Sequence, residues 1–329
     1  MKIIKKNFLQ SVENLLKSKS LEEEIKSAKD LINNFQVFYS EGDLKKRNEK
    51  QTSGGIALSS KHAKDCIEDP LRTVRFLKGT YKAILALRTR FNNEKITILY
   101  AGCGPLGTLI IPLLGFFSSD KIEIFLLDIN KSSIESVKKI VEKLNYEDFI
   151  KEYVIADATK YLKPNNSFFH LIVTETMDRA LTKEPQVEIT RNLGKILIKN
   201  GIFIPEKIEV EKGYSFFAKE YIYNSKVDLF KLNTKRITEK EKLFSITSKV
   251  DAKTSFSYET DWISIPSDFE KTPDICLYTC VSIFRNIKLG VSESYITNPI
   301  CIKSLYTIKN KKFKLKYSTK AIPEWKIIE

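Results

Sequence analysis

The sequence predicts an α/β fold: a Rossmann-like doubly wound parallel sheet, with N-terminal helices before it and a C-terminal antiparallel, barrel-like β domain after it. Three observations lead to this prediction. Residues 5–39 have helical spacing, short apolar runs alternate with helix-length intervals in the middle of the chain, and the part beyond Pro205 is β-rich without clear helices. Alternation of this kind is typical of a parallel sheet whose two faces are covered.

Residues 5–39 show two stretches of apolar residues at helical intervals. The pattern is interrupted near residues 18–20, where a serine can cap the second helix. The polar segment 40–55 ends in Ser-Gly-Gly and is interpreted as a linker or a mobile loop. We therefore expect a helical N-terminal appendage over residues 1–50, which could act as a lid or as a dimer contact.

Five short apolar runs follow, separated by intervals long enough for helices. They span Ile96–Ala101, Ile122–Asp128, 153–156, 168–174 and 201–204. These runs predict the parallel strands of a domain over residues 51–205. The β-rich part predicts a second domain, over residues 206–329, that binds substrate or mediates dimerisation.

Composition and charge narrow the classes of function. The 329 residues include 55 Lys and Arg against 41 Asp and Glu, which gives a formal net charge of +14. Lysine is spread along the whole chain, which favours a solvated basic surface over nucleic-acid binding. No stretch approaches the roughly 20 apolar residues of a membrane span. We expect a cytoplasmic protein with no membrane partner and no secretion signal.

Five scattered cysteines make an odd set that fits free thiols in a reducing compartment. Cys276 and Cys280 are four residues apart, but the two histidines, His62 and His170, lie far from them in sequence. A tetrahedral zinc site needs four such ligands together, so no metal is expected.

Glycines cluster after the first predicted strand, in ITILYAGCGPLG. The turn comprises Ala101, Gly102, Cys103 and Gly104. In such a turn glycine permits positive φ and a close approach of the backbone to a ligand. The N–H groups at the start of the next helix, which Pro112 should kink, can face a carboxylate or phosphate. These residues are candidates for a cofactor site.

Acidic residues follow the second and third predicted strands. Asp128 lies about 20 residues after the glycine loop, where an acid can bind ribose hydroxyls. Asp157, next to Ala158, lies where an acid or amide could contact an adenine, although it could also cap a helix. A dinucleotide or another nucleoside cofactor would use such a loop and acid.

GCGPLG resembles the glycine motif of class I S-adenosylmethionine-dependent methyltransferases more closely than a dinucleotide motif, because Pro105 directly follows Gly104. Those enzymes usually carry an acid two residues before the first glycine, where this chain has Tyr100. The resemblance implies S-adenosyl-L-methionine as the cofactor of residues 51–205.

Residues 62–215 resemble the protein arginine methyltransferases. That family has two glutamates nine residues apart with a methionine two positions after the first, as Glu175, Met177 and Glu184 are here. The family motif Asp-x-x-Arg-Thr reads DPLRT, which makes Arg72 the expected partner of the cofactor carboxylate. The resemblance implies that Glu175 and Glu184 are catalytic. Glu175, after the fourth strand, is also expected beside the cofactor.

Two features of the family have no clear equivalent. The paired tyrosines that cover the site are missing from GGIALSSKHAKD, and the late Thr-His-Trp loop has only a loose counterpart in Thr260-Asp261-Trp262. Glu184 with Pro185 could instead simply start a helix, and Arg72 could be an ordinary ion-paired arginine.

Two carboxylates suit a guanidinium because they can hold its planar fork with charge-assisted hydrogen bonds. We therefore expect an S-adenosylmethionine-dependent methyltransferase acting on a guanidine or amine nitrogen of arginine, or of an arginine-like small molecule or peptide. A homodimer is a further expectation. Two alternatives stay open: an N- or O-methyltransferase of a specialised metabolite, and a non-catalytic protein that binds a polyanion or a partner.

Overall fold

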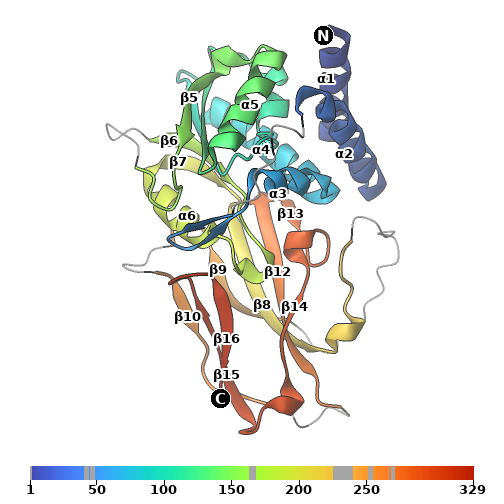
Figure 1. Ribbon diagram of the computed structural model, residues 1–329, viewed down its shortest axis with the longest axis vertical. Coiled ribbons are helices and arrows are strands. Elements are labelled where there is room, and N and C mark those ends of the chain that lie inside the picture. The colour runs from blue at the N-terminus through green and yellow to red at the C-terminus, as the bar shows by residue number, and fades with distance from the viewer. Residues whose placement is uncertain are drawn as a thin grey trace.

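The computed structural model of the protein describes residues 2–40, 44, 49–162, 168–224, 240–250, 255–265, 267 and 271–329. Figure 1 shows a pair of N-terminal helices, a sheet flanked by helices, and a set of antiparallel strands next to it. This arrangement confirms the fold class. The domain boundaries at residues 50 and 205 stay predictions. Part of the expected linker, residues 41–43 and 45–48, lies outside the described residues.

Parallel strands form the central sheet in the order β5-β4-β3-β6-β7. They are β3 (Ile96–Ala101), β4 (Ile122–Asp128), β5 (Ile150–Ile155), β6 (Phe169–Thr174) and β7 (Leu197–Ile204). The bounds of β3 and β4 are as predicted, whereas β5 and β7 begin before the predicted 153 and 201. The register pairs Ala101 with Leu127 and with Thr174, so the carboxyl ends of β3, β4 and β6 meet at one edge.

Helices cover both faces of this sheet, and every residue of β3 and β6 is buried. The helices are α3 (Ser60–Asp65), α4 (Pro70–Arg90), α5 (Lys131–Leu144) and α6 (Gln186–Leu193). Asp69 caps α4 and Pro70 is its first residue, which fixes where the helix begins and places Arg72 in the first turn. Within the described residues, no helix has both the length and the apolar character required to cross a bilayer.

The segment after the glycine loop is not an α-helix, so the prediction of a helix kinked by Pro112 is wrong. Residues 108–110 form a turn, and a 3₁₀-helix follows at Ile111–Phe116 with Pro112 in its first turn. Proline fixes φ and has no N–H to donate. It is therefore tolerated at the start of a helical turn but interrupts a longer α-helix.

The N-terminal helices α1 (Lys2–Lys17) and α2 (Leu21–Phe35) pack against each other and against α4. A capping box begins α2: the Ser20 hydroxyl accepts from the Glu23 amide at 3.2 Å, and the Glu23 carboxylate accepts from the Ser20 amide at 3.2 Å. The rings of Phe8 and Phe35 stack between α1 and α2 at 5.3 Å and are fully buried. The apolar faces of these helices thus form part of the core.

Ion pairs join α2, α4 and the C-terminal part of the chain. Glu24 on α2 lies 2.8 Å from Lys78 Nζ and 3.3 Å from Arg75 Nε on α4. Arg75 Nη1 in turn lies 2.5 Å from Glu293 Oε2. These side chains are largely shielded from water, which strengthens such pairs relative to exposed ones.

The C-terminal part consists of two antiparallel sheets. One contains β8 (Lys207–Ser215), β9 (Glu241–Ile246), β12 (Asp274–Phe284), β13 (Ile287–Leu289) and β14 (Ile300–Ser304), and the other contains β10 (Ser257–Glu259), β11 (Ile263–Ser264), β15 (Lys312–Ser318) and β16 (Glu324–Ile328). Aromatic rings pack between the sheets, with Trp325 5.6 Å from Phe244 and 5.0 Å from Tyr317. A separate hairpin is formed by β1 (Lys50–Thr52) and β2 (Gly55–Ala57).

Asp69 connects the start of α4 to the C-terminal part and is only 2% exposed. Its Oδ2 accepts from the Ser294 hydroxyl at 2.6 Å and from the Tyr295 amide at 2.9 Å, while its Oδ1 accepts from the Arg72 amide at 3.3 Å. One carboxylate thus serves three donors on two parts of the chain.

Asp69→Ala should lower the free energy of unfolding by ~2–4 kcal/mol, because a helix cap is lost and buried donors are left unpaired. Urea denaturation followed by circular dichroism measures this change. Asp65→Ala, at a side chain that is 49% exposed, is the control and should change stability little. Equal stability of the two variants would show that Asp69 does not hold the two parts together.

Candidate functional site

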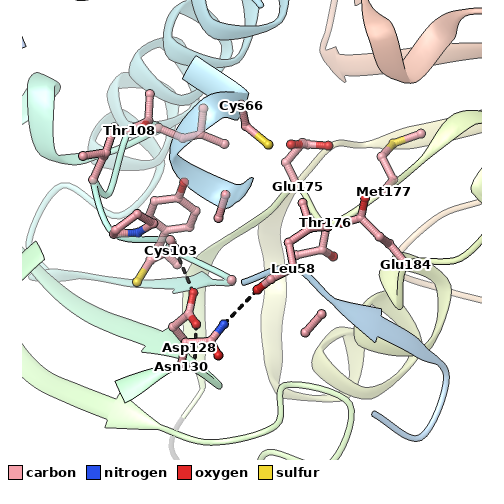
Figure 2. A pocket seen from close by; sticks show the side chains of 18 of the residues that line it. Leu58, Cys66, Cys103, Thr108, Asp128, Asn130, Glu175, Thr176, Met177 and Glu184 are labelled. Carbon is pink, nitrogen blue, oxygen red and sulfur yellow. Dashed lines mark hydrogen bonds between the residues drawn. The ribbon is translucent and has the colours of Figure 1, made fainter. Parts of the chain in front are cut away.

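A cavity of ≈ 950 Å³, measured out to its open mouth, lies at the carboxyl edge of β3, β4 and β6. Its position agrees with the rule that ligands of open α/β sheets bind outside the carboxyl ends of the strands. Figure 2 shows Cys103, Asp128 and Asn130 on one side and Glu175, Met177 and Glu184 on the other. We name these sides the loop wall and the acidic wall.

The loop wall is organised by Asp128, the last residue of β4. Asp128 Oδ2 accepts from the Gly104 amide at 2.9 Å, and Oδ1 accepts from the Asn130 amide at 2.7 Å. Burial raises the pKa of the Asp128 carboxyl, while these two N–H donors act in the opposite direction. Asp128 therefore shapes the glycine loop as well as lining the cavity.

The glycine loop needs glycine for both its backbone angles and its packing. Gly102 and Gly104 have φ of 65° and 63°, in the left-handed region. A Cβ on Gly102 would lie 2.4 Å from Cγ2 of Thr176, the residue after Glu175. The loop wall can therefore approach the acidic wall only because this residue has no side chain.

Arg72 and Glu175 form an ion pair inside the cavity, with Arg72 Nη2 2.6 Å from Glu175 Oε2. Burial opposes the charge of Arg72, but Glu175, Cys66 and Asp69 together outweigh it and raise the pKa of the guanidinium. The Glu175 side chain is only 3% exposed, and burial raises its pKa although Arg72 lowers it. Arg72 belongs to α4 and Glu175 follows β6, so the pair fixes the helix to the sheet edge.

Glu175 Oε1 is buried and has no hydrogen-bond partner in the described structure. A buried acceptor without a donor costs about 1–3 kcal/mol, more when it is charged. Native proteins leave few such atoms unpaired. This oxygen can therefore accept from a donor that a ligand in the cavity supplies.

Glu184 lies in the same acidic wall, two residues before the start of α6. Burial, together with the nearby Glu175 and Asp178, raises the pKa of the Glu184 carboxyl to about 8. At neutral pH this carboxyl is mostly protonated. A cation placed between Glu175 and Glu184 would reverse that shift, because an opposite charge favours the carboxylate.

Most of the sequence-predicted residues meet in this cavity. Arg72, Gly102, Cys103, Gly104, Asp128, Glu175 and Glu184 all line it. The described lining does not include Ala101, which is fully buried at the end of β3. It also leaves out Asp157 and Ala158, which follow β5 at the edge of the sheet.

The carboxylate of Asp157 is used locally, where its Oδ1 accepts from the Thr159 amide at 2.9 Å and from the Thr159 hydroxyl at 2.7 Å. The Ala158 carbonyl accepts from Asn192 Nδ2 at 3.0 Å. Asp157 thus closes a turn, which is a common role of Asp after a strand. The adenine contact expected of these two residues stays a prediction.

The cover of the cavity was not anticipated. Thr52, Ala57 and Leu58, from the β1–β2 hairpin and the residue after it, line the cavity, as does Cys66. Thr52, in the segment predicted as a linker, thus forms part of a wall of the site. No residue of α1 or α2 is among the described lining residues of the cavity, and the role of these helices as a lid or a dimer contact stays a prediction.

Backbone contacts hold this cover in place. The Ile56 amide donates to the Lys183 carbonyl at 2.8 Å, and Asn130 Nδ2 donates to the Leu58 carbonyl at 2.9 Å. Gly55 has φ of 147°, and a Cβ there would lie 2.6 Å from the Lys183 carbonyl oxygen. The Ser-Gly-Gly sequence could have indicated this contact, because glycine permits a close approach between two backbone segments as well as a flexible linker. The cover does without the paired tyrosines of the arginine methyltransferases.

The segment Thr260-Asp261-Trp262 lies outside the described lining of the cavity. The Thr260 hydroxyl accepts from the Leu315 amide at 3.0 Å, and Trp262 is 54% exposed. Among the described residues, no group of three or more His, Cys, Asp and Glu side chains is placed to hold a metal ion.

Comparisons with known proteins bear on the fold. No protein-family model and no curated protein matches the chain. It is similar to the solved structure of Arabidopsis thaliana protein arginine methyltransferase 10, with a TM-score of 0.54 and 13% identity over 82% of this chain and 93% of that chain. The fold is that of a protein arginine methyltransferase. The Trypanosoma brucei PRMT1 enzyme–prozyme heterotetrameric complex with AdoHcy is also similar, with a TM-score of 0.49 and 11% identity over 77% of this chain and 86% of that chain.

Glu184→Gln should change the pH dependence of stability. In the wild type the folded protein keeps a proton on Glu184 up to about pH 8, whereas the unfolded chain loses it near 4.5. Glu184 should therefore lower stability as pH rises from about 5 to 8, by up to ~1.4 kcal/mol per pH unit, and the glutamine variant should lose this contribution to the slope.

Urea denaturation at a series of pH values measures both slopes. Glu135→Gln, at a side chain that is 59% exposed on α5, is the control and should keep the slope of the wild type. If Glu184→Gln keeps that slope too, Glu184 is not protonated in the folded protein at neutral pH.

Proposed function

We propose that the protein is an S-adenosyl-L-methionine-dependent methyltransferase of the EC 2.1.1 class that methylates a guanidine or amine nitrogen of arginine, or of an arginine-like small molecule or peptide. The observation that carries the proposal is the acidic wall: Glu175, with an unpartnered buried oxygen, shares a cavity with Glu184. The fold shared with Arabidopsis protein arginine methyltransferase 10 supports the proposal.

The loop wall fits the cofactor. The left-handed glycines expose backbone at the cavity, Asp128 would bind the ribose hydroxyls, and Arg72 would bind the carboxylate. When bound, S-adenosyl-L-methionine supplies an electrophilic methyl group. Arg72 already faces an acid in the cavity, so it can exchange the Glu175 carboxylate for another carboxylate without being left unpaired.

The acidic wall fits a guanidinium. Arginine presents five N–H donors in a planar fork, and Glu175 Oε1 is an acceptor that lacks a donor. The positive charge would also lower the raised pKa of Glu184, so that both carboxylates become charged around it. The two acids would then orient one nitrogen toward the methyl group, and either could accept a proton from that nitrogen.

Asp128→Ala should weaken binding of S-adenosyl-L-methionine by about tenfold or more, because it removes the ribose contact and the acceptor that shapes the loop. Isothermal titration calorimetry measures the affinity. Asp157→Asn is the matched comparison and should bind like the wild type, because the Asp157 carboxylate serves Thr159. Weakened binding only in the Asp157 variant would reverse the assignment of the two acids.

Glu175→Gln and Glu184→Gln should each lower turnover of arginine or an arginine peptide by about 100-fold while cofactor affinity changes little, because they remove charges that orient the acceptor. Formation of S-adenosylhomocysteine measures turnover. Cofactor binding by the wild type without arginine turnover would favour a specialised-metabolite methyltransferase. No cofactor binding, with salt-dependent binding of a polyanion, would favour a non-catalytic protein.

A further inference from the structure

The backbone between the two glutamates has an unusual conformation. Ala180, Leu181 and Lys183 have φ of 50°, 59° and 60°, in the left-handed region that residues with a Cβ seldom adopt. The Glu184 amide then donates to the Thr182 carbonyl at 2.6 Å. We name residues 178–184 the glutamate hairpin. Lys183, the last left-handed residue, directly precedes Glu184. The direction of the Glu184 side chain therefore depends on the contacts that maintain this backbone conformation.

The β domain supplies hydrogen bonds to these residues. The Thr279 hydroxyl on β12 accepts from the Ala180 amide at 3.0 Å, and Trp325 Nε1 on β16 donates to the Ala180 carbonyl at 2.9 Å. The Tyr317 hydroxyl on β15 donates to the Leu181 carbonyl at 2.7 Å. The strands that meet at the glutamate hairpin belong to both antiparallel sheets.

A fourth contact, between backbone groups, secures the last left-handed residue. The Lys183 amide donates to the Pro323 carbonyl at 2.9 Å. On its other side the Lys183 carbonyl accepts from the Ile56 amide of the cover. Ala180 and Leu181 are each only 1% exposed, so water cannot replace the β-domain groups if these are removed.

We propose that Thr279, Tyr317 and Trp325 are positioning residues, through which the β domain holds the glutamate hairpin in its left-handed conformation and so sets Glu184 opposite Glu175. This inference rests on the proposed function of the two glutamates. It assigns the β domain a direct part in the arrangement of the acceptor site, in addition to packing against the sheet.

The polar atoms, and not only the aromatic bulk, carry the effect. Phenylalanine would serve equally well if Tyr317 and Trp325 only filled the core between the sheets. Their hydroxyl and indole N–H instead donate to successive carbonyls of the glutamate hairpin. Thr279 is fully buried on β12, and its hydroxyl accepts from the same residue that Trp325 contacts.

Near-isosteric variants separate this role from general stability. Thr279→Val and Tyr317→Phe remove one polar atom each, and Thr279→Ser keeps the hydroxyl. Tyr258→Phe is the control, because Tyr258 is the cross-strand partner of Tyr317 on β10 and the described contacts of its ring are with Phe244 and Trp325. Amide hydrogen exchange, kcat and KM for arginine, cofactor affinity and Tm are measured on the full chain.

Exchange of the Lys183 amide is the decisive signal, because its own acceptor, the Pro323 carbonyl, is unchanged in both variants. We expect Thr279→Val and Tyr317→Phe to accelerate this exchange about tenfold or more. We expect kcat to fall by about 10- to 100-fold with cofactor affinity unchanged. Thr279→Ser should restore both values, and Tyr258→Phe should match the wild type.

Unchanged exchange at Lys183 in the Thr279→Val and Tyr317→Phe variants would overturn the proposal. Faster exchange with kcat at the wild-type level would overturn the positioning role. If kcat and Tm fall together in Thr279→Val and Tyr317→Phe, and fall as much in Tyr258→Phe, the effect is a general loss of stability. That result would also overturn the positioning role. If the wild type turns over no arginine, the proposed function fails, and the exchange of Lys183 alone decides whether the β domain holds the glutamate hairpin.

Discussion

The buried ion pair between Arg72 and Glu175 is the constraint on which the site depends. It joins the first turn of α4 to the acidic wall at the end of β6, in the cavity that the loop wall also lines. Arg72 is the basic side chain of the described lining, which also contains the carboxyl groups of Asp128, Glu175 and Glu184. Backbone N–H groups serve Asp128 and Arg72 serves Glu175, so Glu184 is left with a proton in place of a cation.

Maintaining the acidic wall has an energetic cost. A left-handed residue with a Cβ costs roughly 1–2 kcal/mol, and the glutamate hairpin contains several. The unpaired Glu175 oxygen adds to this. Stability elsewhere offsets the strain, through the fully buried strands of the sheet and the aromatic cluster of the β domain. Natural proteins commonly keep local strain of this kind at functional sites.

The sequence correctly predicted those features that follow from a local pattern of residues. Apolar runs gave the bounds of β3 and β4, and the carboxyl ends of neighbouring parallel strands then had to meet, which brought Asp128 and Glu175 to one edge. The features that the sequence did not predict depend on contacts between residues that are far apart in the chain. Whether Ser-Gly-Gly acts as a linker depends on its contact with the Lys183 carbonyl, far along the chain. No pattern within residues 175–184 shows that Tyr317 and Trp325 hold them.

The contact between Trp325 and Ala180 has a consequence for how the protein is made. The two residues are separated by 145 positions, and domains generally begin to fold from the N-terminal side during synthesis. The parallel sheet and the glycine loop can therefore form on the ribosome while the glutamate hairpin still lacks its partners in the β domain. The hydrogen bonds to the glutamate hairpin are complete only after β16 has emerged, so a chain terminated before β16 would keep the parallel sheet without the Trp325 contact to Ala180.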